Sequence, residues 1–229
     1  MFKSLLGKGG EGGLRIGDSM RVKPDILDEK FGTDLSGWQG RVVEIDEKNQ
    51  LILLAWDSVT LNAMPESFIS AVEQNGSGWD QYYLRSDDAE AVSARDTETD
   101  VEAVVEQITR KFYWHYLGEE GIEISKVLAG TDLDDEFEQF ERWEEYFSSV
   151  LRFPFEAEIT ESQDRGPLHS GDILTVQGVE SVEDIYGLIV RVKKGRKTYH
   201  FPLCDLTPTD EKSPNYQPVR NYAIWFANR

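Results

Sequence analysis

Residues 168–203 read LHSGDILTVQGVESVEDIYGLIVRVKKGRKTYHFPL. The stretch has a Gly-Asp pair near its start and contains three apolar segments, which are DILTVQG, YGLIVRVK and KTYHFPL. The polar residues KKGR between the last two segments suit a tight hairpin turn. Apolar runs of this length, bounded by turn residues, are typical of β-strands. Together with FEAEIT, residues 155–160, the stretch predicts a small antiparallel sheet.

Two landmarks of this stretch recur near the start of the chain. LHSGDILTV, residues 168–176, matches LRIGDSMRV, residues 14–22, at its Leu, Gly, Asp and Val positions. GLIVRV, residues 187–192, matches GRVVEI, residues 40–45, as a Gly-led apolar strand. A Gly-Asp turn, a strand, a variable loop and a Gly-led strand form the pattern of a small SH3-like barrel. Two copies in the same order predict tandem barrels.

The segment between the two copies has the period of helices. Residues 96–118 place apolar side chains three and four positions apart, with Thr99 or Asp100 as the expected N-cap. Residues 132–151, DLDDEFEQFERWEEYFSSVL, predict a second amphipathic helix with acids on its polar face. The apolar face of that helix is formed by Phe137, Phe140, Trp143, Tyr146, Phe147 and Val150.

These patterns predict an α+β, mostly β fold with three parts. Residues 1–93 form an N-terminal SH3-like β domain, residues 94–150 an acidic helical segment, and residues 151–229 a C-terminal SH3-like domain. The predicted architecture is therefore two small barrels joined by two helices. A chain of 229 residues is long enough for two such domains.

The net charge of the chain limits the classes of partner that it can bind. The formal net charge is −19, and residues 94–150 alone carry 16 acidic and 5 basic side chains. A surface this negative repels nucleic acids and anionic membranes, whereas it attracts cations and basic proteins. No apolar run approaches 18 residues, and MFKSLLGKGGEGG at the start resembles a flexible tail or a turn more than a signal peptide. With one cysteine, these features predict a cytoplasmic protein.

Catalytic signatures are missing from the sequence. The three histidines, His115, His169 and His200, lack metal-ligand spacing, and Cys204 has no histidine close in sequence. We find no phosphate-binding glycine loop and no nucleophile motif. The sequence therefore predicts a protein that is not an enzyme.

Of two acidic stretches that could bind a cation, only the second remains a candidate, because the first fails as an EF-hand and is better explained as a solvated helix face. Residues 132–143 begin like an EF-hand loop, but Phe137 replaces its glycine and Trp143 replaces its final glutamate. Residues 179–184, VESVED, fall in the predicted variable loop, where one turn would let Glu180, Glu183 and Asp184 converge. Asp172 and Asp205 could approach from strand ends. An ordinary polar loop explains the same spacing, so both interpretations stay open.

Several motifs of the last third resemble the CcbP-like, cyanobacterial-type family of acidic calcium-binding proteins. These motifs are WEEYFSSVLRFPFEAEI, GDILTV, VEDIYGLIVRVKKGRK, FPLCDL and SPNYQPVRNYAIWFANR, all within residues 143–229. The resemblance implies an SH3-like barrel with a flanking helix, which binds Ca²⁺ through surface carboxylates without an EF-hand. The carboxylates that the resemblance offers as possible Ca²⁺ ligands are Glu156, Glu158, Asp172, Glu180, Glu183, Asp184 and Asp205.

The chain departs from this family in two respects. An additional barrel-like region precedes the matching part, whereas the family is usually one short domain. Residues 151–229 are also nearly neutral, with 10 basic and 11 acidic side chains, which predicts weak binding.

Two functions follow from these observations. The first is a non-enzymatic calcium-binding protein, a buffer or a sensor, with Ca²⁺ as its ligand. The alternative is an acidic SH3-like adaptor that binds a basic protein partner. Its groove would be lined by aromatic residues, for which the candidates are Trp38, Trp56, Trp79, Tyr186 and Trp225.

Overall fold

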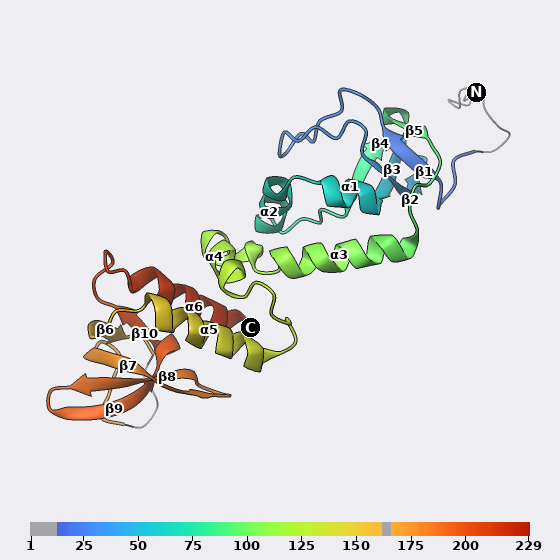
Figure 1. The fold of residues 1–229 in the computed structure, drawn as a ribbon. Coiled ribbons are helices and arrows are strands. Elements are labelled where there is room, and N and C mark those ends of the chain that lie inside the picture. Colours follow the sequence, from blue (N-terminus) through green and yellow to red (C-terminus); the bar gives the residue numbers. More distant parts are fainter. Residues whose placement is uncertain (1–12, 162–165) are drawn as a thin grey trace. The chain divides into compact units, whose positions relative to one another are not determined.

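The computed structural model describes residues 13–161 and 166–229. The chain divides into two compact units, with the boundary between Tyr116 and Leu117. Each unit contains one five-stranded sheet in which all paired strands are antiparallel (Figure 1). The predicted α+β class is therefore confirmed. The tail or turn expected for residues 1–13 lies outside the described residues except for Gly13.

Neither sheet closes into a barrel within the described residues. The strand order is β4-β3-β2-β1-β5 in the N-terminal unit and β10-β6-β7-β8-β9 in the C-terminal unit. The two outermost strands of each sheet pair on one side only, so both sheets are open. The closed barrels that the sequence patterns predict are not formed in the described residues. The pattern of apolar residues identifies individual strands, but it does not determine whether the two outermost strands of a sheet pair with each other.

The N-terminal sheet contains the two strands that its landmarks predict, β1 and β2. Its strands are β1 (Ser19–Val22), β2 (Gln39–Asp46), β3 (Leu51–Trp56), β4 (Gln81–Arg85) and β5 (Ala89–Ala91). Gly40 is required in β2 because a Cβ atom there would lie 2.3 Å from the carbonyl oxygen of Ala55 in β3. The 3-10 turn η1 (Ser86–Asp88) leads into β5.

Three helices cover the N-terminal sheet. They are α1 (Ser58–Ala63), α2 (Glu66–Gln74) and α3 (Glu98–Phe112). Helix α3 begins with a capping box of Thr97 and Asp100, so its N-cap is Thr97 and not Thr99 or Asp100 as predicted. Ile108 and Phe112 of α3 are buried in the core of this unit.

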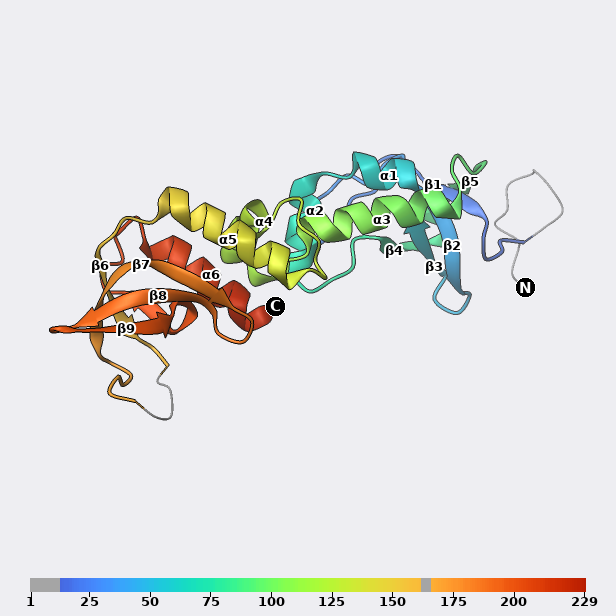
Figure 2. The same cartoon turned by 60° about the horizontal axis from the view of Figure 1, so that its bottom comes forward.

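The C-terminal unit combines its sheet with three helices. The strands are β6 (Phe155–Ile159), β7 (Ile173–Glu183), β8 (Gly187–Lys194), β9 (Lys197–Pro202) and β10 (Leu206–Pro208), with the 3-10 turn η3 (Leu203–Asp205) before β10. The helices are α4 (Glu119–Val127), α5 (Glu136–Val150) and α6 (Tyr216–Asn228). Helices α5 and α6 lie side by side over the sheet (Figures 1 and 2).

An aromatic core joins α5 and α6 to the sheet. Trp143 and Phe147 of α5 contact Tyr222 of α6, with ring centroids 5.3 and 5.5 Å apart, and all three side chains are buried. The Tyr222 hydroxyl accepts a hydrogen bond of 2.7 Å from the backbone N–H of Leu188. Gly187, with φ of +66°, permits this approach, because a Cβ atom there would lie 2.3 Å from that hydroxyl.

The repeated Gly-Asp landmark forms the same turn in both units. The Asp18 carboxylate accepts a 2.8 Å hydrogen bond from the N–H of Arg15, and Asp172 accepts the same bond from His169. The first turn leads into β1, next to the edge strand, whereas the second leads into the central strand β7. The landmark therefore specifies a local turn and not a position in the sheet.

The stretch VESVED is not a loop. Residues 179–183 belong to β7, where they pair with β8 up to the partners Glu183 and Gly187. The register shifts between Val179 and Ser181, which marks a β-bulge. The bulge breaks the alternation of side chains, and this is why the end of a strand, with two of the three acids, resembled a polar loop.

Candidate functional site

The seven candidate carboxylates occupy four places on the C-terminal sheet. Glu156 and Glu158 lie on the exposed face of β6, while Ala157 and Ile159 between and after them are buried. Their neighbours across the sheet are Thr175 and Ile173 on β7 and Thr207 on β10. Glu156 and Glu158 are separated by the buried Ala157, so their side chains lie on the same face of the strand.

Asp172 is held by an ion pair. Its carboxylate contacts the Lys194 ammonium and accepts a 2.8 Å hydrogen bond from the N–H of His169. The hydrogen bond from Lys194 is the main reason why the pKa of Asp172 lies below its usual range. A cation binding here would have to displace Lys194.

The three acids of VESVED do not converge. Glu180, at the bulge, pairs with Arg191 at 3.4 Å. Glu183 ends β7 and Asp184 begins the hairpin turn, and both side chains are exposed. The backbone carbonyl of Asp184 accepts a 3.4 Å hydrogen bond from the Nη2 atom of Arg229.

Asp205 has the most unusual environment of the seven. It lies in η3, and burial raises the pKa of its carboxyl, to which the nearby charge of Glu161 adds. The Cys204 thiol lies 3.6 Å from its Oδ1 atom and favours the ionised form. A partly buried carboxylate next to a second carboxylate is an arrangement that a cation stabilises.

Glu161 is the residue that sequence reasoning missed. It lies two residues after the end of β6, next to Thr160, whose backbone N–H donates a 2.9 Å hydrogen bond to the carbonyl of Asp205. Pairing of β6 with β10 therefore brings these two chain segments together. The signal in the sequence is an acid immediately after the predicted strand FEAEIT.

The described residues contain no preformed metal cluster. Within residues 13–161 and 166–229, no three His, Cys, Asp or Glu side chains are placed to share one metal ion. Backbone carbonyls and water would have to supply most of the six to eight oxygens that Ca²⁺ prefers.

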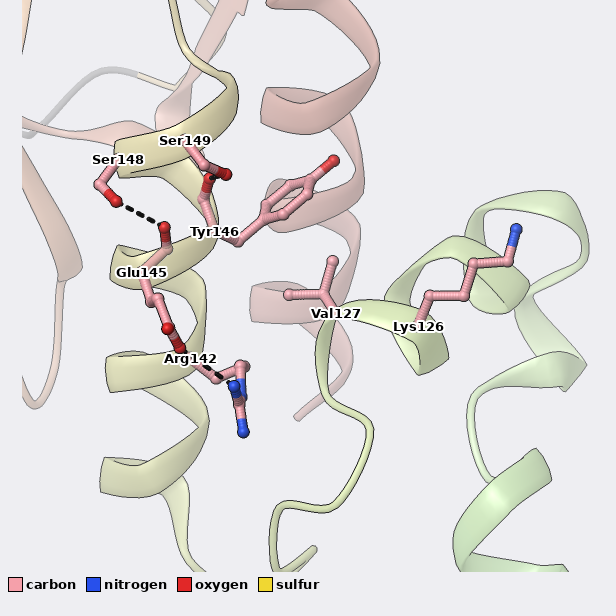
Figure 3. Close-up of a pocket in the computed structure, with 7 residues that line it drawn as sticks. All are labelled: Lys126, Val127, Arg142, Glu145, Tyr146, Ser148 and Ser149. Atoms are coloured by element: carbon pink, nitrogen blue, oxygen red, sulfur yellow. Dashed lines mark hydrogen bonds and ion pairs between the residues drawn. The ribbon is translucent and has the colours of Figure 1, made fainter.

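A cavity of about 440 Å³ lies between α4 and α5 (Figure 3). The hydroxyls of Ser148 and Ser149 donate hydrogen bonds to carbonyls of their own helix, each at 2.7 Å. Arg142 pairs with Glu145 at 3.0 Å, and Lys126 points away from these residues. The polar groups are thus satisfied locally and do not converge on a common point.

The predicted aromatic groove is not formed. Trp56, Trp79 and Trp225 are buried in the cores of their units, and Trp38 is half-buried against Trp56. Tyr186 alone of the five candidates is exposed. These tryptophans stabilise the fold and are not available to a peptide.

In the part of the chain that the structure describes, no helix is both long enough and apolar enough to span a membrane.

One family model matches the C-terminal part of the chain. Residues 125–226 match the CcbP family, described as calcium binding. The crystal structure of Anabaena CcbP is 18% identical and covers 46% of this chain and 89% of its own, with a TM-score of 0.38. A structure described as a calcium binding protein in the calcium-binding form is also 18% identical and covers 45% of this chain and 87% of its own, with a TM-score of 0.34.

The search of curated proteins finds no match. The family match includes α5, the whole C-terminal sheet and most of α6. The similarity of this chain to the CcbP calcium-binding family thus extends over residues 125–226.

Proposed function

We propose that the C-terminal unit binds Ca²⁺ through surface carboxylates, without an EF-hand and without catalysis. The family match of residues 125–226 is the observation that carries this proposal. The role of the ion is that of a bound ligand, in a buffer or a sensor. In both units the first four strands lie side by side in chain order, and the fifth strand pairs with the first. This common strand order and the common Gly-Asp turn support the SH3-like interpretation of both units.

Asp205 is the first candidate among the seven carboxylates. Its ionised form is already disfavoured by burial and by Glu161, so a divalent cation would relieve an electrostatic cost there. The exposed pair Glu183 and Asp184 is the second candidate, because neither side chain has to leave an ion pair with a lysine or arginine of the described residues. Asp172 and Glu180 are weaker candidates, since each already has a cationic partner.

Glu156 and Glu158 complete the proposed set on β6. Glu158 lies opposite Thr207 of β10, close in sequence to Asp205. A calcium ion at Asp205 could therefore recruit Glu158 only after a local movement, since no three-carboxylate group exists in the described residues.

The proposal is tested by thermal denaturation of the full chain with Ca²⁺ or with Mg²⁺ at equal concentration. A specific site raises the melting temperature more with Ca²⁺, because ligand binding to the native state stabilises it. Calorimetric titration then gives the affinity. Equal shifts with the two ions, or no shift, would refute a specific calcium site.

Variants locate the site. If Asp205 is a ligand, Asp205→Asn abolishes the extra stabilisation by Ca²⁺, whereas loss in the double variant Glu183→Gln and Asp184→Asn places the ion at the hairpin. Glu47→Gln is the matched control, because Glu47 lies in the β2–β3 hairpin turn of the other unit. Tryptophan fluorescence distinguishes a sensor, which changes conformation with Ca²⁺, from a buffer.

A further inference from the structure

Three exposed apolar side chains lie at one end of the C-terminal unit. Phe137 is 63% exposed, Ile185 77% and Tyr186 49%. Phe137 lies in the first turn of α5, and the other two form the β7–β8 hairpin turn. We call these residues, with Glu136, Glu183 and Asp184, the hairpin–helix surface.

Arg229 ties the two halves of this surface together. Its Nη2 atom lies 3.4 Å from the carbonyl oxygen of Asp184, and its Nε atom lies 3.9 Å from the Glu136 carboxylate. The same guanidinium stacks on Phe226 of α6, 3.8 Å from the ring centroid. Figures 1 and 2 both show the hairpin, the start of α5 and the end of α6 next to one another.

Neither the formation of α5 nor the hairpin turn requires apolar residues at these exposed positions. Phe137 continues the apolar stripe of α5, whose members Phe140, Trp143 and Phe147 are buried. The Asp135 cap accepts hydrogen bonds from the N–H groups of Phe137 and Glu138, both at 3.1 Å, so the first turn is ordered. Turns usually consist of Gly, Asn, Asp and Ser, yet this hairpin turn presents Ile and Tyr.

The rim of the surface is strongly negative. The two segments that form it, residues 132–138 and 183–186, carry seven carboxylates and no lysine or arginine. The charge of Arg229 is already directed at Glu136 and at the carbonyl of Asp184. An apolar patch with such a rim repels acidic partners and attracts cationic ones.

We propose that the hairpin–helix surface docks a basic amphipathic segment of a partner protein. Apolar side chains of the segment pack on Phe137, Ile185 and Tyr186, while its lysines or arginines meet the acids of the rim. The proposal goes beyond calcium binding and does not depend on it, because the three apolar residues are not metal ligands. It also differs from a groove of buried tryptophans, which the fold excludes.

The probe is a fluorescent synthetic peptide of leucine and lysine with an amphipathic pattern, titrated against the full chain in a chelator. The double variant Phe137→Ser and Ile185→Ser should weaken binding about tenfold or more, since it removes central apolar anchors. The matched control is Ile16→Ser with Leu27→Ser, because these side chains are 70% and 57% exposed on the N-terminal unit. The control should bind within about twofold of the unchanged chain.

If the double variant does not fold, Ile185→Ser alone tests the proposal, because a side chain exposed at a turn contributes little to stability. Binding should weaken with added salt, and a peptide with serine in place of lysine should bind more weakly. Equal losses in the control, equal binding of the uncharged peptide, or no binding would overturn the proposal. Sedimentation is decisive for one rival occupant: self-association that Ile185→Ser abolishes would mean that a second copy covers the surface.

Discussion

At the scale of single residues, Asp205 and Cys204 share one partly buried environment. Burial raises the pKa of the Asp205 carboxyl, and it raises the pKa of the Cys204 thiol to about 12, with Asp205 adding to the effect. Both groups therefore hold their protons more tightly in the folded protein than in the unfolded chain.

Asp205→Asn should raise the melting temperature at neutral pH in the absence of Ca²⁺. Because the folded pKa of this acid is raised, its contribution to stability is fully present below the unfolded pKa and is lost as pH rises through the folded pKa. The variant removes that loss, so the difference in melting temperature between the variant and the unchanged chain should shrink below about pH 4. Thermal denaturation in a chelator at several pH values measures it. A lower melting temperature at neutral pH would mean that the carboxylate stabilises the fold.

Cys204 should react slowly with iodoacetamide in the native protein at neutral pH. Alkylation requires the thiolate, and a pKa of about 12 leaves very little of it. Mass spectrometry of timed samples gives the rate, and the urea-unfolded chain provides the fast reference. Equal rates in the two states would contradict the burial of this thiol.

At the scale of elements, the start of α1 depends on one buried carboxylate. Asp57 caps the helix by accepting a 2.7 Å hydrogen bond from the N–H of Thr60. It also pairs with Arg95 through two contacts, with Nε at 2.6 Å and Nη2 at 2.9 Å. This carboxylate therefore connects α1 to the segment that leads into α3.

Asp57→Ala should lower the free energy of unfolding by about 3 kcal/mol, because it removes a helix cap and leaves Arg95 without its carboxylate partner. Asp57→Asn should cost less, since its amide oxygen can still accept the bond from Thr60. Urea denaturation followed by tryptophan fluorescence measures both variants against Asp87→Ala, an exposed aspartate of the same unit. A loss below about 1 kcal/mol for Asp57→Ala would show that the cap and the ion pair contribute little.

The elements also show what a single sequence can predict. Strands and helices with a clear period, such as β6 and α5, could be predicted, because burial on one face determines their pattern. The strands β5 and β10, of three residues each, are too short to show a period. The bulge in β7 concealed a strand in VESVED, and Arg229 lies 45 residues from Asp184, so no local pattern could indicate their contact.

The candidate site could be predicted only as a set of carboxylates. The family motifs selected the correct region, but which acids come near one another depends on strand pairing. Glu161 approaches Asp205 because β6 pairs with β10, and Asp172 is occupied because Lys194 reaches it from β8. These relations follow from the sheet topology and not from spacing in the sequence.

At the scale of the whole molecule, the two units differ in how far along each unit its last core residues lie. The N-terminal core closes with Phe112 of α3, the last residue in its buried cluster. The C-terminal core needs Trp143 from α5 as well as Tyr222 and Trp225 from α6. The second unit thus spans almost the entire second half of the chain.

The late position of α6 has a consequence for synthesis on the ribosome. The N-terminal unit can fold while the second half is still being translated, since domains fold as units during synthesis. The C-terminal sheet, in contrast, emerges with Trp143 and the Leu188 N–H lacking their partners until α6 has followed. During that interval the nascent second unit exposes apolar surface, and it is then that it would most need a chaperone.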